Sequence, residues 1–181
     1  MLPVAPASDL CAKGAASGQI DYQEKMDSLG KALGRIASGV YIVTLQHEGL
    51  RQGVLITWIS QASFEPPTLT IAFNKERPIL SSIEKGKVLA INILSSRNMD
   101  VFKSFARHAQ PDEDRFTGLA VELSANGCPV FSGAVAYLEC RVESMVDCGD
   151  HFVCLAEVLN GSLLDVDLEP MVHIRKSGFQ Y

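Results

Sequence analysis

A basic group around Pro78 is the first set of side chains that could do chemistry. Lys75, Arg77 and Ser81 surround this proline, and a proline followed by Ile-Leu-Ser-Ser is typical of the first turn of a helix. Helix N-termini present free N–H groups and partial positive charge, both of which attract anions. The segment therefore predicts a phosphate site. The alternative, a helix cap with solvated charges, remains open on this segment alone.

Polar groups on the preceding strands form the second set. Val54–Phe64 is rich in β-branched and aromatic residues, and Pro66-Pro67 ends the run, so a strand is predicted. Thr68–Asn74 alternates apolar and polar residues, as a half-buried strand does. The hydroxyl and amide groups expected to face the phosphate site are Thr57, Ser60, Gln61 and Ser63.

His151 is the third candidate, because it follows a Gly-Asp turn at the start of a predicted strand. An imidazole at a barrel rim can donate or shuttle a proton near neutral pH. The alternative is a strand-end histidine that bonds a neighbouring backbone group. Cys148, His151 and Cys154 do not predict a metal site, since residues three apart in a strand point to opposite faces. Cys154 is expected to be a small buried hydrophobe.

Composition bounds the class of protein. The 181 residues suit one domain, and 47% hydrophobic with 20% charged residues is a globular balance. A net charge of -5 argues against non-specific nucleic-acid binding. No apolar run approaches the length of a membrane span, and the N-terminus lacks the pattern of a signal peptide. Five cysteines without framework spacing then predict free thiols in a reducing, cytoplasmic compartment.

The order of elements favours an antiparallel barrel with helices outside it. Residues 1–25 are rich in Ala, Gly, Pro and Ser and are interpreted as a flexible tail or linker, followed by one domain over 26–181. Helices are predicted over Asp27–Ala37 and Ser96–Ala109, and further strands over Val40–Leu45, Lys87–Leu94, Ala134–Val146, His151–Leu159 and Val172–Lys176. No Gly-x-Gly-x-x-Gly appears, which argues against a Rossmann domain.

Other features receive structural interpretations. Asp112-Glu113-Asp114-Arg115 is expected to be a solvated loop, and Trp58 to lie in the core or in a dimer interface. Tyr181, the terminal residue, is expected to be disordered. A serine hydrolase is not predicted, because Ser38 and Ser60 lie outside any Gly-x-Ser-x-Gly elbow.

Several motifs, in order, are similar to those of the flavin reductase-like family, the FMN-binding split barrels. They are Ser38-Gly39-Val40, Gly53–Ser63 ahead of Pro66-Pro67, Asn74–Ser82, Ala90–Leu94, Ala136–Cys140 and Gly149-Asp150-His151. The chain resembles most the C-terminal flavin reductase module of the flavodiiron proteins of oxygenic phototrophs. That likeness rests on ISQASF, Asp112–Phe116, AYLEC, CGDH and a terminal HxRKSGxxY.

The resemblance implies a mainly β, antiparallel Greek-key split barrel with a few peripheral helices that forms a homodimer. It implies an NAD(P)H:flavin oxidoreductase that binds FMN, uses NAD(P)H as co-substrate and needs no metal. His151 would lie beside the isoalloxazine as the catalytic residue. The residues it assigns to the cofactor are Leu55, Ile56, Thr57, Trp58, Ser60, Gln61, Ala62, Asn74, Lys75, Arg77 and Ser81.

Two further functions remain open. The chain could be a module that keeps FMN and passes electrons to a partner oxidoreductase, or a non-catalytic split barrel that binds haem or flavin. Trp58 is bulkier than the residue many family members carry there. No residue that would read the nicotinamide ribose is identifiable, so the sequence leaves NADH and NADPH as alternatives.

Overall fold

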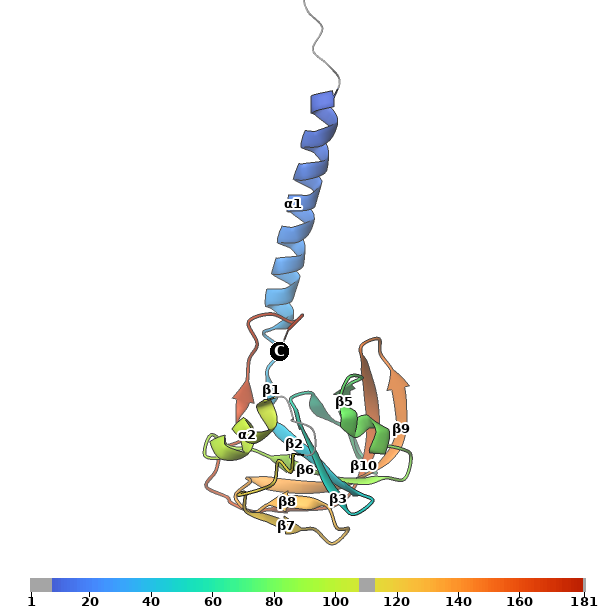
Figure 1. The fold of residues 1–181 in the computed structure, drawn as a ribbon, viewed down its shortest axis with the longest axis vertical. Coiled ribbons are helices and arrows are strands. Elements are labelled where there is room, and N and C mark those ends of the chain that lie inside the picture. The colour runs from blue at the N-terminus through green and yellow to red at the C-terminus, as the bar shows by residue number, and fades with distance from the viewer. Residues whose placement is uncertain (1–7, 108–112, 181) are drawn as a thin grey trace, which may run out of the picture. The chain divides into compact units, whose positions relative to one another are not determined.

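The structure is a computed structural model that describes residues 8–107 and 113–180, and it separates into two units (Figure 1). Unit 1 contains residues 1–37 and 174–181, and unit 2 contains residues 38–173. Every predicted site residue belongs to unit 2. The predictions for residues 1–7, for 110–112 and for Tyr181 lie outside the described residues. None of the described helices combines the length and apolar character that a membrane span requires.

Unit 1 is a helix clasped by the C-terminal segment. The helix, α1 (Ser8–Leu33), begins well before the predicted Asp27. The segment up to residue 25, which was interpreted from the sequence as a flexible tail or linker, is helical from Ser8 onward, and its role as a tail or linker stays a prediction. The clasp consists of two backbone hydrogen bonds, from Gly178 N to Gly30 O (2.6 Å) and from Arg175 N to Gly34 O (3.1 Å).

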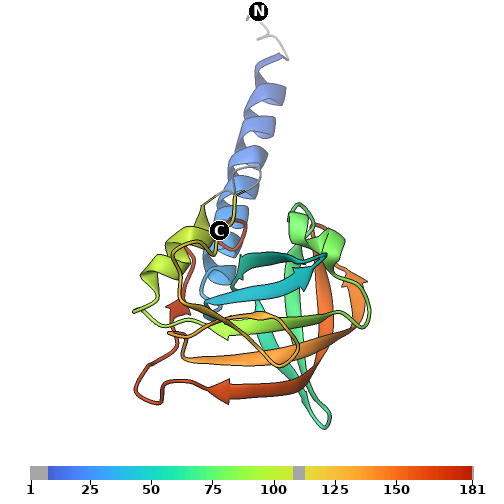
Figure 2. The same cartoon turned by 60° about the horizontal axis from the view of Figure 1, so that its bottom comes forward.

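Unit 2 is built mainly of antiparallel strands, which confirms the predicted fold class. The strands are β1 (Ser38–Gly39), β2 (Tyr41–His47), β3 (Leu50–Ile56), β4 (Ile59–Phe64), β5 (Pro67–Asn74), β6 (Val88–Ile93), β7 (Val121–Leu123), β8 (Pro129–Phe131), β9 (Ala136–Asp147), β10 (His151–Leu163) and β11 (Val172–His173). Seven of them form one sheet in the order β3-β2-β6-β9-β10-β5-β4, and β1–β11 and β7–β8 form separate pairs. Figure 2 shows the large sheet wrapped into a barrel.

The strand predicted over Val54–Phe64 is two strands, and the chain leaves the ladder at Thr57-Trp58. β3 pairs with β2, whereas β4 pairs with β5, so the two segments lie at opposite edges of the sheet order. Two residues span only about 7 Å when extended. The sheet must therefore curl until its two edges approach each other.

The two helical segments of unit 2 are both short. The helix after Pro78 is a single 3-10 turn, η1 (Pro78–Ser82), which is too short to contribute a substantial dipole. The second, α2 (Met99–Ala106), begins after Asn98, three residues later than predicted. The residues before α2 form a turn. Asn98 Oδ1 accepts hydrogen bonds there from the backbone N of Ser95 (2.8 Å) and from Ser95 Oγ (3.0 Å).

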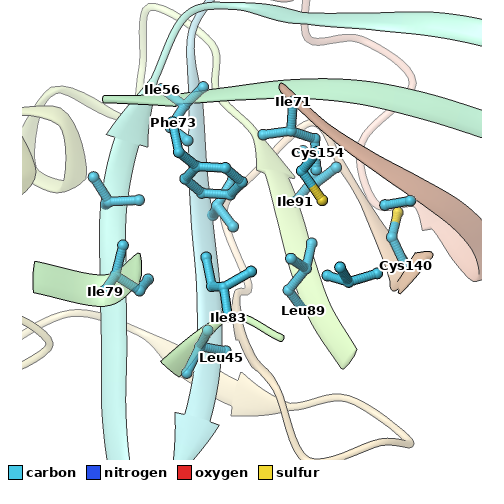
Figure 3. Close-up of a cluster of buried hydrophobic side chains, with 14 of the residues drawn as sticks. Leu45, Ile56, Ile71, Phe73, Ile79, Ile83, Leu89, Ile91, Cys140 and Cys154 are labelled. Carbon is cyan, nitrogen blue, oxygen red and sulfur yellow. The ribbon is translucent and has the colours of Figure 1, made fainter. Parts of the chain in front are cut away.

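The barrel interior is filled by one face of the alternating strands (Figure 3). Phe73, Ile71 and Leu89 are almost completely buried there, and η1 adds Ile79 at the edge of the cluster. Burying apolar side chains of this size contributes about 1.5–3 kcal/mol each. Cys140 and Cys154 belong to the same cluster, so the prediction that Cys154 is a buried hydrophobe is confirmed.

A second apolar cluster fixes α2 against the outside of the sheet. Phe105 of α2 lies 5.3 Å from Phe116 and 5.8 Å from Phe131, ring centroid to ring centroid. A Cβ atom at Gly53 of β3 would lie 2.6 Å from the Phe105 ring, so only glycine allows this approach. The helix and the loop that follows it are thereby held close to β3.

Glu139 of β9 carries a buried carboxylate. It is fully buried, although Arg141 and Glu143, which follow at alternate positions of the strand, are only partly buried. Its carboxylate accepts hydrogen bonds from Ser124 Oγ, from Asn126 N (3.1 Å) and from Asn126 Nδ2 (3.1 Å). A buried carboxylate is tolerated when donors satisfy it. The loop between β7 and β8 supplies those donors.

The cysteines provide a test of this packing. The described cysteines are free, and Cys148 is exposed whereas Cys128, Cys140 and Cys154 are buried. Burial raises the pKa of the Cys128 and Cys154 thiols from 9.0 to about 11, and that of Cys140 to about 12. The folded state thus favours the neutral thiols. Their contribution to the free energy of unfolding is complete below pH 9 and is lost as the pH rises toward these pKa values.

We therefore expect the free energy of unfolding, measured with denaturant under reducing conditions, to fall from about pH 9 to about pH 11. At pH 8 a thiol reagent should label Cys148 quickly and the three buried thiols only on unfolding. In a Cys11→Ser background, which removes the fifth cysteine of the sequence, the Cys148→Ser variant should lose the fast phase. Rapid labelling of the buried cysteines in the folded protein would contradict the packing described here.

Candidate functional site

Four of the predicted site residues meet where β5 ends, β10 begins and the chain passes from β3 to β4; they are Trp58, Asn74, Lys75 and His151. Asn74, the last residue of β5, stands opposite His151, the first residue of β10. Lys75 N donates to Asp150 O (3.0 Å), and Ala72 N donates to Trp58 O (3.0 Å). Residues far apart in the sequence are thus fastened together by backbone hydrogen bonds.

His151 is buried and held by its neighbours. Its Nδ1 lies 2.9 Å from Asp150 Oδ1, and its ring lies 4.9 Å from the Trp58 ring, tilted by 38°. The hydrogen bond with His151 lowers the pKa of the exposed Asp150 carboxyl. An ionised carboxylate can only accept a hydrogen bond, so Nδ1 carries the proton. The geometry fixes the orientation and the tautomer of this imidazole.

Lys75 is engaged by the turn between β9 and β10. Its Nζ lies 2.6 Å from Asp147 Oδ2 and 4.7 Å from the centroid of the Phe152 ring. The hydrogen bond from Lys75 lowers the pKa of the exposed Asp147 carboxyl. The ammonium group therefore secures the turn that carries His151. Its role at a phosphate stays a prediction.

Thr57 has an unsatisfied polar group. Its Oγ1 is inaccessible to solvent and has no hydrogen-bond partner among the described residues. Buried hydroxyl groups are usually hydrogen-bonded, so this atom points to a missing partner such as a ligand. The two residues before it pack inward, Ile56 in the barrel core and Leu55 against the α2 cluster. The side chains of Leu55 and Ile56 already pack against other apolar residues, so only their backbone groups could bind a cofactor.

The predicted polar residues of β4, Ser60 and Gln61, lie on a strand at one end of the sheet order. Both are exposed, as is Ala62, which follows them. Their side-chain hydrogen bonds are local and long, such as Gln61 Nε2 to Ser63 O at 3.3 Å. Such groups are easily redirected to a ligand.

The turn before η1 presents Arg77. Asn74 Oδ1 accepts from Glu76 N (2.8 Å), and Arg77 N donates to Asn74 O (3.1 Å), so the Asn74 side chain shapes this turn. Ser81 Oγ donates to Pro78 O (2.9 Å) within η1. Because η1 is one short turn, attraction of an anion here depends on the side chains rather than on a helix dipole.

Arg115 is a cation that the sequence interpretation missed. It was assigned to a solvated loop, yet it is half-buried, and its guanidinium lies 5.6 Å from the centroid of the Phe105 ring. Burial, and then the charge of Arg107, lower the pKa of Arg115. The sequence offered one signal for this partial burial, because Arg115 stands next to Phe116, an aromatic residue that is itself buried.

No metal centre is indicated: nowhere among residues 8–107 and 113–180 do three or more His, Cys, Asp or Glu side chains gather as ligands.

The family model described as "Flavin reductase like domain" matches residues 33–180. Diflavin flavoprotein A 1 of Synechocystis sp. is 38% identical over 91% of this chain and 29% of its own length. The chain thus spans less than a third of that curated relative.

Two solved structures share the fold. NADH:FAD oxidoreductase SgcE6 of Streptomyces globisporus is 26% identical, with a TM-score of 0.73 over 83% of this chain and 87% of that one. A structure of the same enzyme holds NAD and FAD fragments. Nitrilotriacetate monooxygenase component B of Mycobacterium thermoresistibile is 27% identical, with a TM-score of 0.72 over 87% and 86% of the two chains.

The contact between Trp58 and His151 is testable in solution. Trp58 is the one tryptophan in the sequence, so intrinsic fluorescence reports on this site alone. Replacing the neighbouring imidazole should change the wavelength or intensity of the Trp58 emission, so the His151→Gln variant should differ from wild type. A His47→Gln control should leave the emission unchanged. Identical spectra for wild type and His151→Gln would show that the two rings are apart in solution.

Proposed function

The chain belongs to the family of the flavin reductase like domain, and we propose that it is an NAD(P)H:flavin oxidoreductase that passes a hydride from the nicotinamide to FMN. The observation that carries the proposal is the cluster in which an oriented, buried His151 contacts Trp58 beside the unsatisfied Thr57 hydroxyl. The flavin and nicotinamide names of the similar structures support the class of reaction.

The residues present fit an FMN molecule. The Thr57 hydroxyl, together with Ser60, Gln61 and Asn74, supplies hydrogen-bonding groups suited to the ribityl chain and the ring edge. Arg77 supplies a cation for the phosphate, with Ser81 and Lys75 nearby in sequence. The backbone of Leu55 and Ile56 and the exposed Ala62 complete the proposed set.

When bound, FMN supplies the ring that accepts the hydride. The protein orients the groups of the site and excludes water from it. His151 presents a fixed imidazole whose Nδ1 proton is held by Asp150, and Trp58 covers one side of it. Lys75 holds the turn through Asp147 and keeps His151 in register with Asn74.

The proposal extends to cofactor and compartment. FMN is proposed over FAD on the resemblance, although SgcE6 is named for FAD. NADH and NADPH are both candidates, since no residue of the site identifies the ribose. The four described cysteines are free thiols, which supports a reducing, cytoplasmic compartment.

One observation favours a second function, that of an electron-transfer module: this chain matches only part of the length of the diflavin flavoprotein relative. Because this chain matches 29% of it, the same fold occurs as one part of a longer redox protein. An FMN-holding module that serves a redox partner would keep its flavin through gel filtration and react slowly with NAD(P)H. A reductase that exchanges its flavin would emerge colourless and turn over with added FMN.

The activity test is anaerobic stopped-flow reduction of FMN with NADH and with NADPH. We expect reduction, and we expect His151→Asn to slow it by about 100-fold while changing the FMN dissociation constant little. His47→Asn on β2 is the matched control and should behave as wild type. Reduction at an unchanged rate in His151→Asn would remove this residue from the mechanism. No reduction by the wild type would refute the activity.

We further propose that the protein is a homodimer that buries the open side of unit 2. β10 continues to Leu163, but its ladder with β5 ends at Glu157, so its last residues have an open edge. Phe64, Leu163 and Val166 are 87%, 60% and 79% exposed. Apolar residues at an open edge favour association.

Light scattering at micromolar concentration should give about twice the 19.6 kDa chain mass. The Leu163→Asp variant should shift the protein to the monomer. Leu123 on β7 is equally exposed at 60%, so Leu123→Asp is the matched control and should remain dimeric. A wild-type monomer would overturn this proposal.

A further inference from the structure

His151 is buried by the protein itself. The residue is only 6% exposed, although the turn before it, residues 148–150, is exposed. The Trp58 indole lies against the imidazole, with 4.9 Å between the ring centroids and a tilt of 38°. A group that moves a proton must come within about 2.6–3.2 Å of the atom it serves. Trp58 therefore occupies a side of His151 that a ligand would otherwise contact.

Other neighbours engage the rest of the imidazole. Asp150 Oδ1 lies 2.9 Å from Nδ1, and Asn74 stands opposite His151 in the ladder between β5 and β10. Protein interiors are closely packed, so a buried ring has no spare room beside it. A planar ring of the size of nicotinamide therefore reaches this imidazole only after one of its neighbours has moved.

The backbone that carries the imidazole is firmly fixed. His151 begins β10, which pairs with β5 on one side and with β9 on the other. Cys148 N donates to His151 O (2.9 Å), and Lys75 N donates to Asp150 O (3.0 Å). Lys75 Nζ also pairs with Asp147 across 2.6 Å. Moving His151 would break several of these bonds at once.

The Trp58 side chain moves without breaking a strand. Trp58 lies between β3, which ends at Ile56, and β4, which begins at Ile59. Its carbonyl accepts a hydrogen bond from Ala72 N (3.0 Å), so the backbone is held, whereas the half-buried indole turns about two side-chain bonds. A change of rotamer leaves both ladders intact. The indole, rather than the imidazole, is thus the ring whose movement uncovers His151.

The ring contact determines how strongly the cover acts. Tilted pairs of aromatic rings favour their closed arrangement by a factor of about 2 to 10. A ligand that binds only the open arrangement is weakened by about the same factor. The groups proposed above for FMN, which include Thr57, Ser60 and Arg77, do not include the indole. The cover therefore affects the nicotinamide more than the flavin.

We propose that Trp58 is a specificity-determining residue whose indole covers His151 and turns aside to admit the nicotinamide ring. The inference rests on the proposed function, since it concerns the access of NAD(P)H to the same histidine. It implies that the site binds nicotinamide nucleotides less tightly than the same site without the indole would.

The experiment titrates NAD⁺ and NADP⁺ into the FMN-loaded protein by calorimetry, so that no turnover is needed. Trp58→Ser should lower the dissociation constant of the nucleotide that binds by about 2- to 10-fold and change that of FMN by less than about twofold. Trp58→Phe keeps a smaller aromatic ring and protects folding, and its value should lie between those of wild type and Trp58→Ser. Tyr22→Ser removes an exposed aromatic ring from α1 and is the matched control.

A second measurement follows the indole directly in the wild type. The sequence has one tryptophan, so its indole N–H gives one NMR signal. Saturation with the nucleotide that binds should shift this signal, because the indole leaves the imidazole. The same addition to Trp58→Phe should leave no signal in that region, which verifies the assignment.

Unchanged or weaker nucleotide binding in both Trp58 variants, equal tightening in Tyr22→Ser, or an indole signal that bound nucleotide leaves in place would overturn the inference. If the Trp58 variants bind nucleotide more tightly but neither NADH nor NADPH reduces FMN, the proposed activity fails and this inference stands. If reduction proceeds and the Trp58 variants bind nucleotide as the wild type does, the activity stands and this inference fails.

Discussion

The fold of unit 2 depends on one short connection. Two residues, Thr57 and Trp58, join strands that lie at opposite edges of a seven-stranded sheet. A flat sheet of that width would separate its edges by roughly 29 Å, six spacings of about 4.8 Å, far beyond the reach of two residues. Closure into a barrel is therefore obligatory. It also determines where the connection lies, beside the end of β5 and the start of β10.

The candidate site is a consequence of that closure. The Trp58 carbonyl accepts a hydrogen bond from Ala72, and the Trp58 ring meets His151. The unsatisfied Thr57 hydroxyl occurs in the same two-residue link. Residues that leave a ladder have backbone and side-chain groups that no strand neighbour uses. The same geometry that closes the barrel leaves these groups for a ligand.

Charge is distributed around the site by specific pairings rather than by abundance. Lys75 is neutralised by Asp147, and Arg107 and Arg51 are paired with Glu113 and Asp114. Arg77, in the turn before η1, makes no ion pair with any described residue. A guanidinium without a carboxylate partner can bind an anion, and this is the electrostatic basis for proposing a phosphate at this turn.

The sequence by itself determined the strands whose side chains alternate and the turns between them. Thr68–Asn74 was predicted within one residue of β5, because one face of that strand fills the barrel and the other does not. His151 was placed correctly at the start of β10, since the glycine turn before it is a local signal. Motif order predicted the family, which the match over residues 33–180 confirmed.

Only the tertiary structure decided what depends on non-local partners. Thr57 and Trp58 favour strands as residue types, so the break between β3 and β4 is invisible until their different neighbours are known. Glu139 reads as a surface residue until the β7–β8 loop supplies its donors. Arg115 is interpreted as solvated until Phe105 is found beside it. Local pattern sets which way a side chain points along a strand, but the charges and donors it meets come from distant parts of the chain.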